Sequence, residues 1–405
     1  MSSNKKKVAI IGTVGLPANY GGFETLTDHL VQYLGDQYEM TVYCSRQKYP
    51  RKKRPTTYSH ARLKYMPFAA NGFQSILYDA LSILHAIFFA DVLLILGVSG
   101  AWILPLVRLL TRKRIIISID GIEWKRNKWK LFAKWYLWWA EKIAVRYSHI
   151  DISDNESIQD YTAARYGSLS RIIEYGGDHA RLSEPTDMDK RCFPFLAFPY
   201  AIKVCRIEPE NNVKTILEAF SHMPKRTLVV IGNWDNSSYG KRLKAQYADF
   251  QNIILLNPIY DQRLLNVLRG HALVYIHGHT AGGTNPSLVE AMHLGLPIIT
   301  QGVSYNRTTT EGKALYFQSI SELKTLVENL SIAQLKVIGK SMKDIAQRRY
   351  RWELIINKYD QLIHEAIYMT KKKQVLPALS QMSDQFLAEH EASHLKYQYL
   401  FFEKR

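Results

Sequence analysis

Short apolar runs alternate along the first half of the chain with amphipathic helical patterns. The runs predict strands at residues 8–12, 40–44, 92–97, 114–120 and 149–153. A helical pattern at 22–34 follows the first run, and others separate the later runs. Such alternation is typical of a parallel, doubly wound α/β sheet, because crossover helices cover both faces of the strands.

The second half repeats this pattern after an interruption near residue 182, where prolines and mixed charges indicate a linker. New strands are predicted at 200–206, 227–232, 252–256, 272–276, 297–300 and 314–317, and residues 319–368 have a helical pattern. We expect two Rossmann-like domains over 1–185 and 190–365, with a helical tail over 366–405. Two such domains predict an interdomain cleft, with ligands at the carboxyl ends of the strands.

The apolar segment 74–110 raises the question of a membrane span. Asp79, His85 and Asp91 interrupt it, so it contains no run of about twenty apolar residues. A buried helix followed by a buried strand at 92–97 explains it better. The N-terminal run is too short for a signal peptide, and three scattered cysteines suit a reducing cytosol.

The distribution of basic residues along the chain indicates a candidate binding surface. The net charge is +17, and residues 40–78 hold eight Lys or Arg and no acid. The densest part is Arg51, Lys52, Lys53 and Arg54. Such a patch attracts nucleic acid, an anionic membrane or phosphorylated substrates, although a solvated loop explains it equally well.

Two glycine-containing turns are candidate anion sites. The first, GTVGLPANYGGFETL, places Gly21 and Gly22 at a helix start with Glu24 in the first turn. It is not the GxGxxG dinucleotide fingerprint, and permissive glycines at a helix start are the alternative. The second, HGHTAGGTNPSLVEAM, joins the strand at 272–276 to a helix. Small residues would let a phosphate reach unpaired helix amides, although a plain turn is again possible.

Four segments together resemble a known family. They are GTVGLPANYGGFETL, DGIEWKRNKW, RIEPENNVKTILEAF and GGTNPSLVEAM. In this order they resemble bacterial GT-B glycosyltransferases of the retaining, family-4 type, and most closely the rhamnosyltransferase-like branch that builds cell-surface polysaccharides. The resemblance runs over roughly residues 7–365. It implies a GT-B fold, an acceptor-side N-terminal domain, a nucleotide-sugar donor domain and no metal cofactor.

The resemblance also implies site residues. Arg206, Gly283, Thr284 and Asn285 match positions that contact the donor diphosphate, and Glu290 matches the carboxylate that holds the donor ribose. Gly21 and Gly22 match the loop beside the donor phosphates. His279 is expected to line the cleft while His277 packs; with no third ligand evident, the pair predicts no metal site.

Asp120 and Glu123 are the candidate carboxylates for sugar or acceptor hydroxyls. Asp120 is the stronger candidate because it ends a predicted strand at the cleft, where it could orient or deprotonate the acceptor. Capping of the next helix is the alternative for Asp120. Gly282 and Asn211 stand where the wider superfamily has a Glu and a Lys. A lost carboxylate is consistent with a deoxy sugar such as rhamnose.

The stretch 124–146 is rich in Trp and Lys, a composition typical of a membrane interface. As a helix it would carry a polar stripe of Asn127, Lys130, Lys134 and Glu141. A core helix with a basic edge is the alternative. Together with the basic patch, Trp124, Lys125 and Trp129 are expected to meet the membrane and acceptor.

Two other motifs carry less weight. The DMD sequence at 187–189 lies in the linker, so a metal role is discounted. The segment 307–317 fits either a lid over the donor or a plain loop.

The resemblance thus implies transfer of a sugar, expected to be L-rhamnose from dTDP-rhamnose, to a saccharide linked to polyprenyl diphosphate. The enzyme would sit peripherally on the inner face of the cell membrane. A GT-B-fold sugar-nucleotide epimerase and a basic nucleic-acid-binding protein are the competing hypotheses. No nucleic-acid recognition module is evident, so a nucleic-acid partner is not expected.

Overall fold

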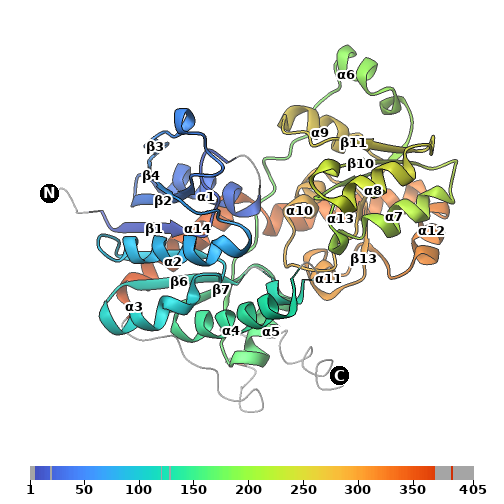
Figure 1. Ribbon diagram of the computed structural model, residues 1–405. Coiled ribbons are helices and arrows are strands. Elements are labelled where there is room, and N and C mark those ends of the chain that lie inside the picture. Colours follow the sequence, from blue (N-terminus) through green and yellow to red (C-terminus); the bar gives the residue numbers. More distant parts are fainter. Residues whose placement is uncertain (1–4, 19–20, 120, 127–128, 370–384, 386–405) are drawn as a thin grey trace. The chain divides into compact units, whose positions relative to one another are not determined.

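The computed structural model describes residues 5–18, 21–119, 121–126, 129–369 and 385. The chain divides into two compact units (Figure 1). Unit 1 comprises residues 1–125, 129–173 and 356–405, and unit 2 comprises 126–128 and 174–355. Each unit is built on a mostly parallel sheet covered by helices, which confirms the predicted α/β class.

The sheet of unit 1 has the strand order β3-β4-β2-β1-β5-β6-β7-β8. Its strands are β1 (Lys7–Ile11), β2 (Glu39–Ser45), β3 (Thr57–Tyr58), β4 (Ala61–Met66), β5 (Val92–Leu96), β6 (Arg114–Ile119), β7 (Ile150–Ser153) and β8 (Arg171–Ile172). Among the described strand pairs of this sheet, β3 and β4 alone run antiparallel. The five predicted strands are confirmed to within about one residue at each end, and β3, β4 and β8 were missed.

The first unit's helices include one segment from the far end of the chain. They are α1 (Gly22–Leu34), η1 (Arg51–Lys53), η2 (Gly72–Gln74), α2 (Ser75–Ala86), η3 (Ala101–Ile103), α3 (Leu104–Leu110), η4 (Glu123–Lys125), α4 (Leu131–Tyr147) and α5 (Glu156–Tyr166), together with the part of α14 (Trp352–Tyr368) from Ile356 onward. Several contacts hold α14 here; among them, the Tyr38 hydroxyl donates to Asp360 at 2.7 Å, and Arg171 pairs with Glu365 at 3.0 Å.

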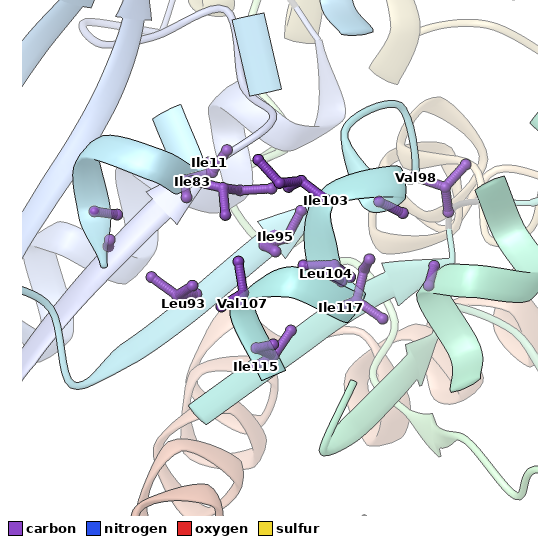
Figure 2. Packing of buried hydrophobic residues seen from close by; sticks show 14 of the residues in the cluster. Ile11, Ile83, Leu93, Ile95, Val98, Ile103, Leu104, Val107, Ile115 and Ile117 are labelled. Carbon is purple, nitrogen blue, oxygen red and sulfur yellow. The ribbon is translucent and has the colours of Figure 1, made fainter. Parts of the chain in front are cut away.

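The main core of unit 1 lies between its central strands and the helices α2, η3 and α3. Alternate residues of β1, β5 and β6 face the same side because side chains of a strand alternate between its faces. They meet η3 and α3 in one closely packed cluster that includes Ile11, Leu93, Ile95, Ile115, Ile117, Ile103, Leu104 and Val107 (Figure 2). Burying each such side chain stabilises the unit by about 1.5–3 kcal/mol.

The sheet of unit 2 is entirely parallel, with the strand order β11-β10-β9-β12-β13-β14. The strands are β9 (Tyr200–Val204), β10 (Thr227–Ile231), β11 (Ile253–Leu256), β12 (Val274–His277), β13 (Ile298–Gln301) and β14 (Leu315–Phe317). The helices are α6 (Asp187–Cys192), η5 (Pro194–Ala197), η6 (Pro209–Asn211), α7 (Val213–Ser221), η7 (Trp234–Asn236), α8 (Ser238–Tyr247), α9 (Gln262–Gly270), α10 (Pro286–His293), α11 (Ser304–Thr309), α12 (Ile320–Glu328) and α13 (Ile332–Arg349). The six predicted strands are all present.

The segment 74–110 forms α2, β5, η3 and α3 rather than one long helix. Within the described ranges, no helix is both long enough and apolar enough to cross a membrane.

Candidate functional site

The strand order of unit 2 places a topological switch point between β9 and β12. From β9 the chain winds outward through β10 and β11, and it then returns to the other side of β9 to form β12. Loops leaving two such strands at their carboxyl ends diverge, which opens a crevice where ligands bind in doubly wound sheets. Arg206 follows β9, and the turn from Gly278 to Asn285 follows β12. Arg206 and the turn that holds Gly283, Thr284 and Asn285 therefore follow the two strands that flank this switch point.

The backbone around Arg206 is fixed while its side chain stays accessible. Asn211 Nδ2 donates to the Arg206 carbonyl at 2.6 Å, and the Ile207 amide donates to Asn233 Oδ1 at 2.8 Å. The Arg206 side chain is 45% exposed, and its guanidinium lies 3.8 Å from the Glu208 carboxylate. Asn211 thus does not replace the superfamily lysine as a cation; it holds the strand end that carries Arg206.

Asn285 begins α10 as its N-cap. Its Oδ1 accepts from the Ser287 amide at 3.1 Å and from Ser287 Oγ at 2.8 Å. The Tyr275 hydroxyl lies 3.0 Å from Ser287 Oγ and 3.1 Å from the Val204 carbonyl, so it links α10 to the end of β9.

A second link ties the turn after β12 to the loop after β9. The Thr280 amide and hydroxyl both donate to the Glu210 carbonyl, at 2.8 and 3.0 Å. Further along the turn, Gly282 adopts a φ of +125°, and a Cβ built there would meet no atom within 4 Å. Thr284 is buried. The turn is therefore preorganised against the loop that carries Arg206.

The carboxylate of Glu290, in the second turn of α10, contacts two basic side chains. Its Oε2 pairs with the buried Arg269 of α9, and its Oε1 accepts from His179 Nε2 at 3.0 Å. Trp352 Nε1 donates to His179 Nδ1 at 3.0 Å, so the proton directed at Glu290 is the one on His179 Nε2.

Opposing effects act on the ionisation of Glu290. Burial raises its pKa, but Arg269 and His179 outweigh burial and hold the pKa at about 2. The carboxylate is thus charged throughout the neutral range. Its two unshared lone-pair directions could accept from ligand hydroxyls. Sequence reasoning missed Arg269 and His179, because neither stands near Glu290 in the chain.

The two histidines after β12 stack rather than form a metal site. Their rings lie 4.2 Å apart and nearly parallel, and His277 also stacks on Tyr275. Burial lowers the pKa of both His277 and His279 well below the usual value, so both are neutral. His277 packs in the interior, as expected, and His279 is only partly covered.

The glycine turn of unit 1 also follows a strand at a switch point, here between β1 and β5. Gly21 has a φ of +117°, and a Cβ there would lie 2.0 Å from Glu24 Oε2. Glu24 Oε1 accepts from the Val14 amide at 2.7 Å and from Thr13 Oγ1 at 3.1 Å. Gly22 is the first residue of α1. Glu24 therefore supports the loop after β1, and Gly21 makes room for it.

Of the two candidate catalytic carboxylates, Asp120 lies outside the described residues. Glu123 is in η4, where its Oε1 accepts from Trp129 Nε1 at 3.0 Å. Trp124 donates from Nε1 to the Tyr161 hydroxyl at 2.9 Å. Both tryptophans pack against the core of unit 1. Lys125 is exposed, with its Nζ 5.7 Å from the Trp124 ring.

The predicted polar stripe along 124–146 is wrong at two points. The α-helix begins only at Leu131. Glu141 is buried and accepts from the Tyr161 and Tyr166 hydroxyls, each at 2.5 Å, so it belongs to the interior. Asn127 lies outside the described part of the chain.

The basic patch is partly structural. Arg51 and Lys52 are exposed, and Lys53 completes the short helix η1. Arg54 donates to the carbonyls of Tyr49 and Arg46 at 2.7 and 2.9 Å, which fixes this turn.

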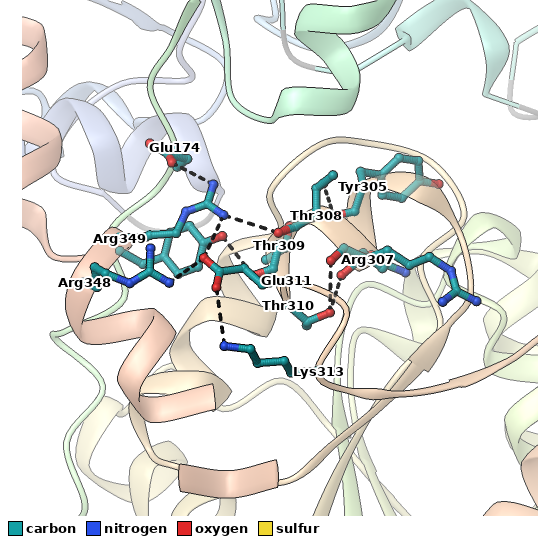
Figure 3. A network of polar contacts seen from close by, with 12 residues as sticks. Glu174, Tyr305, Arg307, Thr308, Thr309, Thr310, Glu311, Lys313, Arg348 and Arg349 are labelled. Carbon is teal, nitrogen blue, oxygen red and sulfur yellow. Dashed lines mark hydrogen bonds and ion pairs between the residues drawn. The ribbon is translucent and has the colours of Figure 1, made fainter. Parts of the chain in front are cut away.

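Segment 307–317 is tied to the end of α13 (Figure 3). Glu311 accepts from Arg348 at 2.6 Å and from Arg349 at 3.4 Å, and Arg349 also pairs with Glu174 at 3.2 Å. The Tyr350 hydroxyl donates to the Thr309 carbonyl at 2.9 Å. These contacts favour the plain-loop interpretation over a lid.

The DMD sequence forms the first turn of helix α6 and takes part in its N-terminal cap. Thr186 and Asp189 form a capping box, and Arg263 pairs with Asp189 at 2.8 Å. Across the described ranges, no group of three or more His, Cys, Asp or Glu side chains could hold a metal ion.

Two family models match parts of the chain. Residues 194–312 match the family of group 1 glycosyl transferases, and residues 5–178 match a domain of unknown function, DUF1972. No curated protein sequence matches the chain.

Solved structures show the same fold at low identity. Sucrose-phosphate synthase from Thermosynechococcus elongatus is 17% identical with a TM-score of 0.74, over 89% of this chain and 99% of that one. HepE of Anabaena in complex with UDP-glucose is 15% identical with a TM-score of 0.68, over 89% and 99%. A glycosyltransferase from Rickettsia africae is 15% identical with a TM-score of 0.67, over 90% and 100%. The chain thus has a GT-B fold, and the part of unit 2 at residues 194–312 matches the group 1 glycosyl transferases.

Proposed function

We propose that this enzyme transfers L-rhamnose from dTDP-rhamnose to a polyprenyl-diphosphate-linked saccharide during cell-surface polysaccharide synthesis. One observation supports the position of the donor site. Arg206 and the turn before α10 both follow strands that flank one switch point, and Tyr275 and Thr280 link the two loops by hydrogen bonds. A diphosphate needs both a bidentate cation and helix amides, and both lie at this point.

The roles follow from how charge changes in the reaction. The leaving diphosphate gains negative charge as the glycosidic bond breaks, so Arg206 and the amides of Gly283, Thr284 and Asn285 would stabilise it in the transition state. Glu290, fixed in its charged form, would accept from the ribose hydroxyls, and the partly covered His279 would line the donor pocket. Gly21 and Gly22 would border the phosphates.

On the acceptor side, Asp120, with Glu123 as the weaker candidate, would orient or deprotonate the acceptor hydroxyl. No metal is assigned a role in the reaction.

The choice of rhamnose rests on the resemblance and on Gly282. Its φ of +125° suits glycine and leaves the adjacent space without a carboxylate. A hydroxyl missing from a deoxy sugar needs no such partner. The HepE structure contains UDP-glucose, so both base and sugar must be tested.

The acceptor assignment places the enzyme peripherally on the inner face of the cell membrane. Arg51, Lys52, Lys53 and Arg54 would attract its anionic lipids, and Trp124, Lys125 and Trp129 would stand near the lipid-linked acceptor.

A donor screen tests the proposal. Purified enzyme, membrane extract and a panel of nucleotide sugars are assayed for released nucleoside diphosphate. We expect release from dTDP-rhamnose that depends on the extract. Release only from UDP-sugars would contradict the donor assignment. Conversion of a nucleotide sugar without any acceptor would instead favour the epimerase.

A further inference from the structure

Unit 1 exposes a group of large apolar side chains on η3, α3 and α4, which we call the α3–α4 face. Leu109 is 81% exposed, Leu131 87%, Phe132 73% and Trp135 61%. The whole group comprises Trp102, Leu106, Leu109, Leu110, Leu131, Phe132, Trp135, Trp138 and Trp139. Contiguous apolar surface of this kind marks an interaction site.

The spacing of these residues shows that they form stripes. Residues 131, 135, 138 and 139 follow an i, i+4, i+7, i+8 pattern, which keeps them on one side of α4. Residues 102, 106, 109 and 110 repeat this spacing through η3 and α3. The opposite sides, represented by Val107 and Leu137, are buried in the core. Since α3 packs against α4, the two stripes are neighbours.

The exposed charged side chains on η3, α3 and α4 themselves are all basic. No Asp or Glu occurs between residues 92 and 119, and the acid of α4, Glu141, is buried. Lys142 and Arg146 continue the exposed stripe of α4 by one and two further turns, and Arg112 is exposed just after α3. At 100° per residue, the exposed residues of α4 all lie within an arc of about 120°.

The distribution of tryptophan separates this face from the rest of the protein. In the described part of the chain, the exposed tryptophans are Trp102, Trp135, Trp138 and Trp139. Trp124 and Trp129 pack against the core instead. Amphipathic rings beside Lys and Arg are the pattern that binds the interface of an anionic bilayer. A second copy of the chain would oppose these cations with cations, which disfavours self-association.

We infer that the α3–α4 face inserts into the headgroup region of an anionic lipid bilayer, with Leu and Trp at the acyl boundary and Lys142 and Arg146 on lipid phosphates. The inference deepens the proposed function, on which it rests for the need to reach a lipid-linked acceptor. It assigns the apolar contact to this face and leaves Arg51–Arg54 a long-range electrostatic role.

The test is partitioning of the full-length protein onto vesicles. Phosphatidylglycerol–phosphatidylcholine vesicles are compared with phosphatidylcholine alone, for the wild type and for Leu109→Ser/Leu110→Ser/Phe132→Ser/Trp135→Ser. We expect the quadruple variant to lose about tenfold or more of its partitioning onto the anionic vesicles, because it removes four insertable side chains. Ile332→Ser/Val337→Ser on α13 is the matched control, also exposed and apolar, and should partition like the wild type.

Brominated lipids add a direct readout, because they should quench tryptophan fluorescence of the wild type. Equal partitioning of the wild type and quadruple variant would overturn the inference, as would no binding of the wild type. A concentration-dependent dimer that the variant abolishes would assign the face to a second copy instead. An assay of diphosphate release with a detergent-dispersed acceptor separates the two proposals. The folded quadruple variant should release diphosphate as the wild type does. If the wild type released none, that result would count against the proposed function alone.

Discussion

The two βα turns that carry the candidate donor residues use a carboxylate in opposite ways. In unit 1, Glu24 turns back from α1 to accept from the loop after β1, and Gly21 leaves room for it. In unit 2, Glu290 is held by Arg269 of α9 and by His179, neither of which belongs to its own turn. Both carboxylates are fixed, and that of Glu290 is paired with the buried cation of Arg269.

This difference indicates a division of labour. In unit 1, Glu24 accepts from an amide and a hydroxyl and so helps to shape the loop after β1. A carboxylate that must stay charged while largely buried needs a cationic partner. Residues with similar local sequence, a Glu soon after a glycine turn, therefore support a loop in one unit and form a charged site in the other.

Removing the partner of Glu290 should have the largest effect on stability. Arg269→Met leaves a mostly buried carboxylate with His179 alone, and we expect unfolding to become easier by about 3 kcal/mol. Urea denaturation measures this. Glu24→Gln is the matched control: its amide oxygen can still accept from Val14, so its cost should stay near about 1 kcal/mol. Equal losses of unfolding free energy in Arg269→Met and Glu24→Gln would contradict the difference between the two carboxylates.

Alanine substitutions at Gly21 and Gly282, which both have positive φ, should distinguish the cost of backbone strain from that of a steric clash. Gly21→Ala adds strain and pushes a Cβ against Glu24, whereas Gly282→Ala adds strain with open space around it. We expect about 1–2 kcal/mol of destabilisation from strain in both, and more for Gly21→Ala. Thermal unfolding of both variants measures the difference. A larger cost at Gly282 would show that the packing of Glu24 is misjudged.

Acid should reveal the charge on Glu290. Its pKa falls from 4.5 to about 2 on folding, so its contribution is complete above pH 4.5 and is lost as the pH drops toward 2. The melting temperature of the wild type should therefore fall more steeply between pH 5 and 3 than that of Glu290→Gln. Parallel curves for the two proteins would mean that Glu290 is not stabilised as a charge.

Chelation should have the smallest effect. We expect EDTA to leave transferase activity unchanged, because the proposed diphosphate partners are Arg206 and backbone amides. Activity that disappears with EDTA and returns with one divalent ion would refute this.

The sequence predicted the buried strands well because their apolar runs are local. It missed β4, whose residues alternate between buried and exposed because one face carries Arg62 and Lys64. Long-range partners were also invisible: His179 meets Glu290 across 111 positions, and Tyr166 meets Glu141 across 25. A charged residue in a helix is usually solvated, which is why Glu141 was placed on an exposed stripe. The domain boundaries and the site roles stay predictions.

Steady-state kinetics of Arg206→Ala and Glu290→Gln test the central claim, that the donor diphosphate lies against Arg206 and the α10 turn. Arg206 should meet charge that develops only as the diphosphate leaves, so its loss should lower kcat by roughly a hundredfold. Ribose hydroxyls do not change during the reaction, so Glu290→Gln should mainly raise KM for the donor. A folded Arg206→Ala enzyme with near-normal kcat would contradict the account.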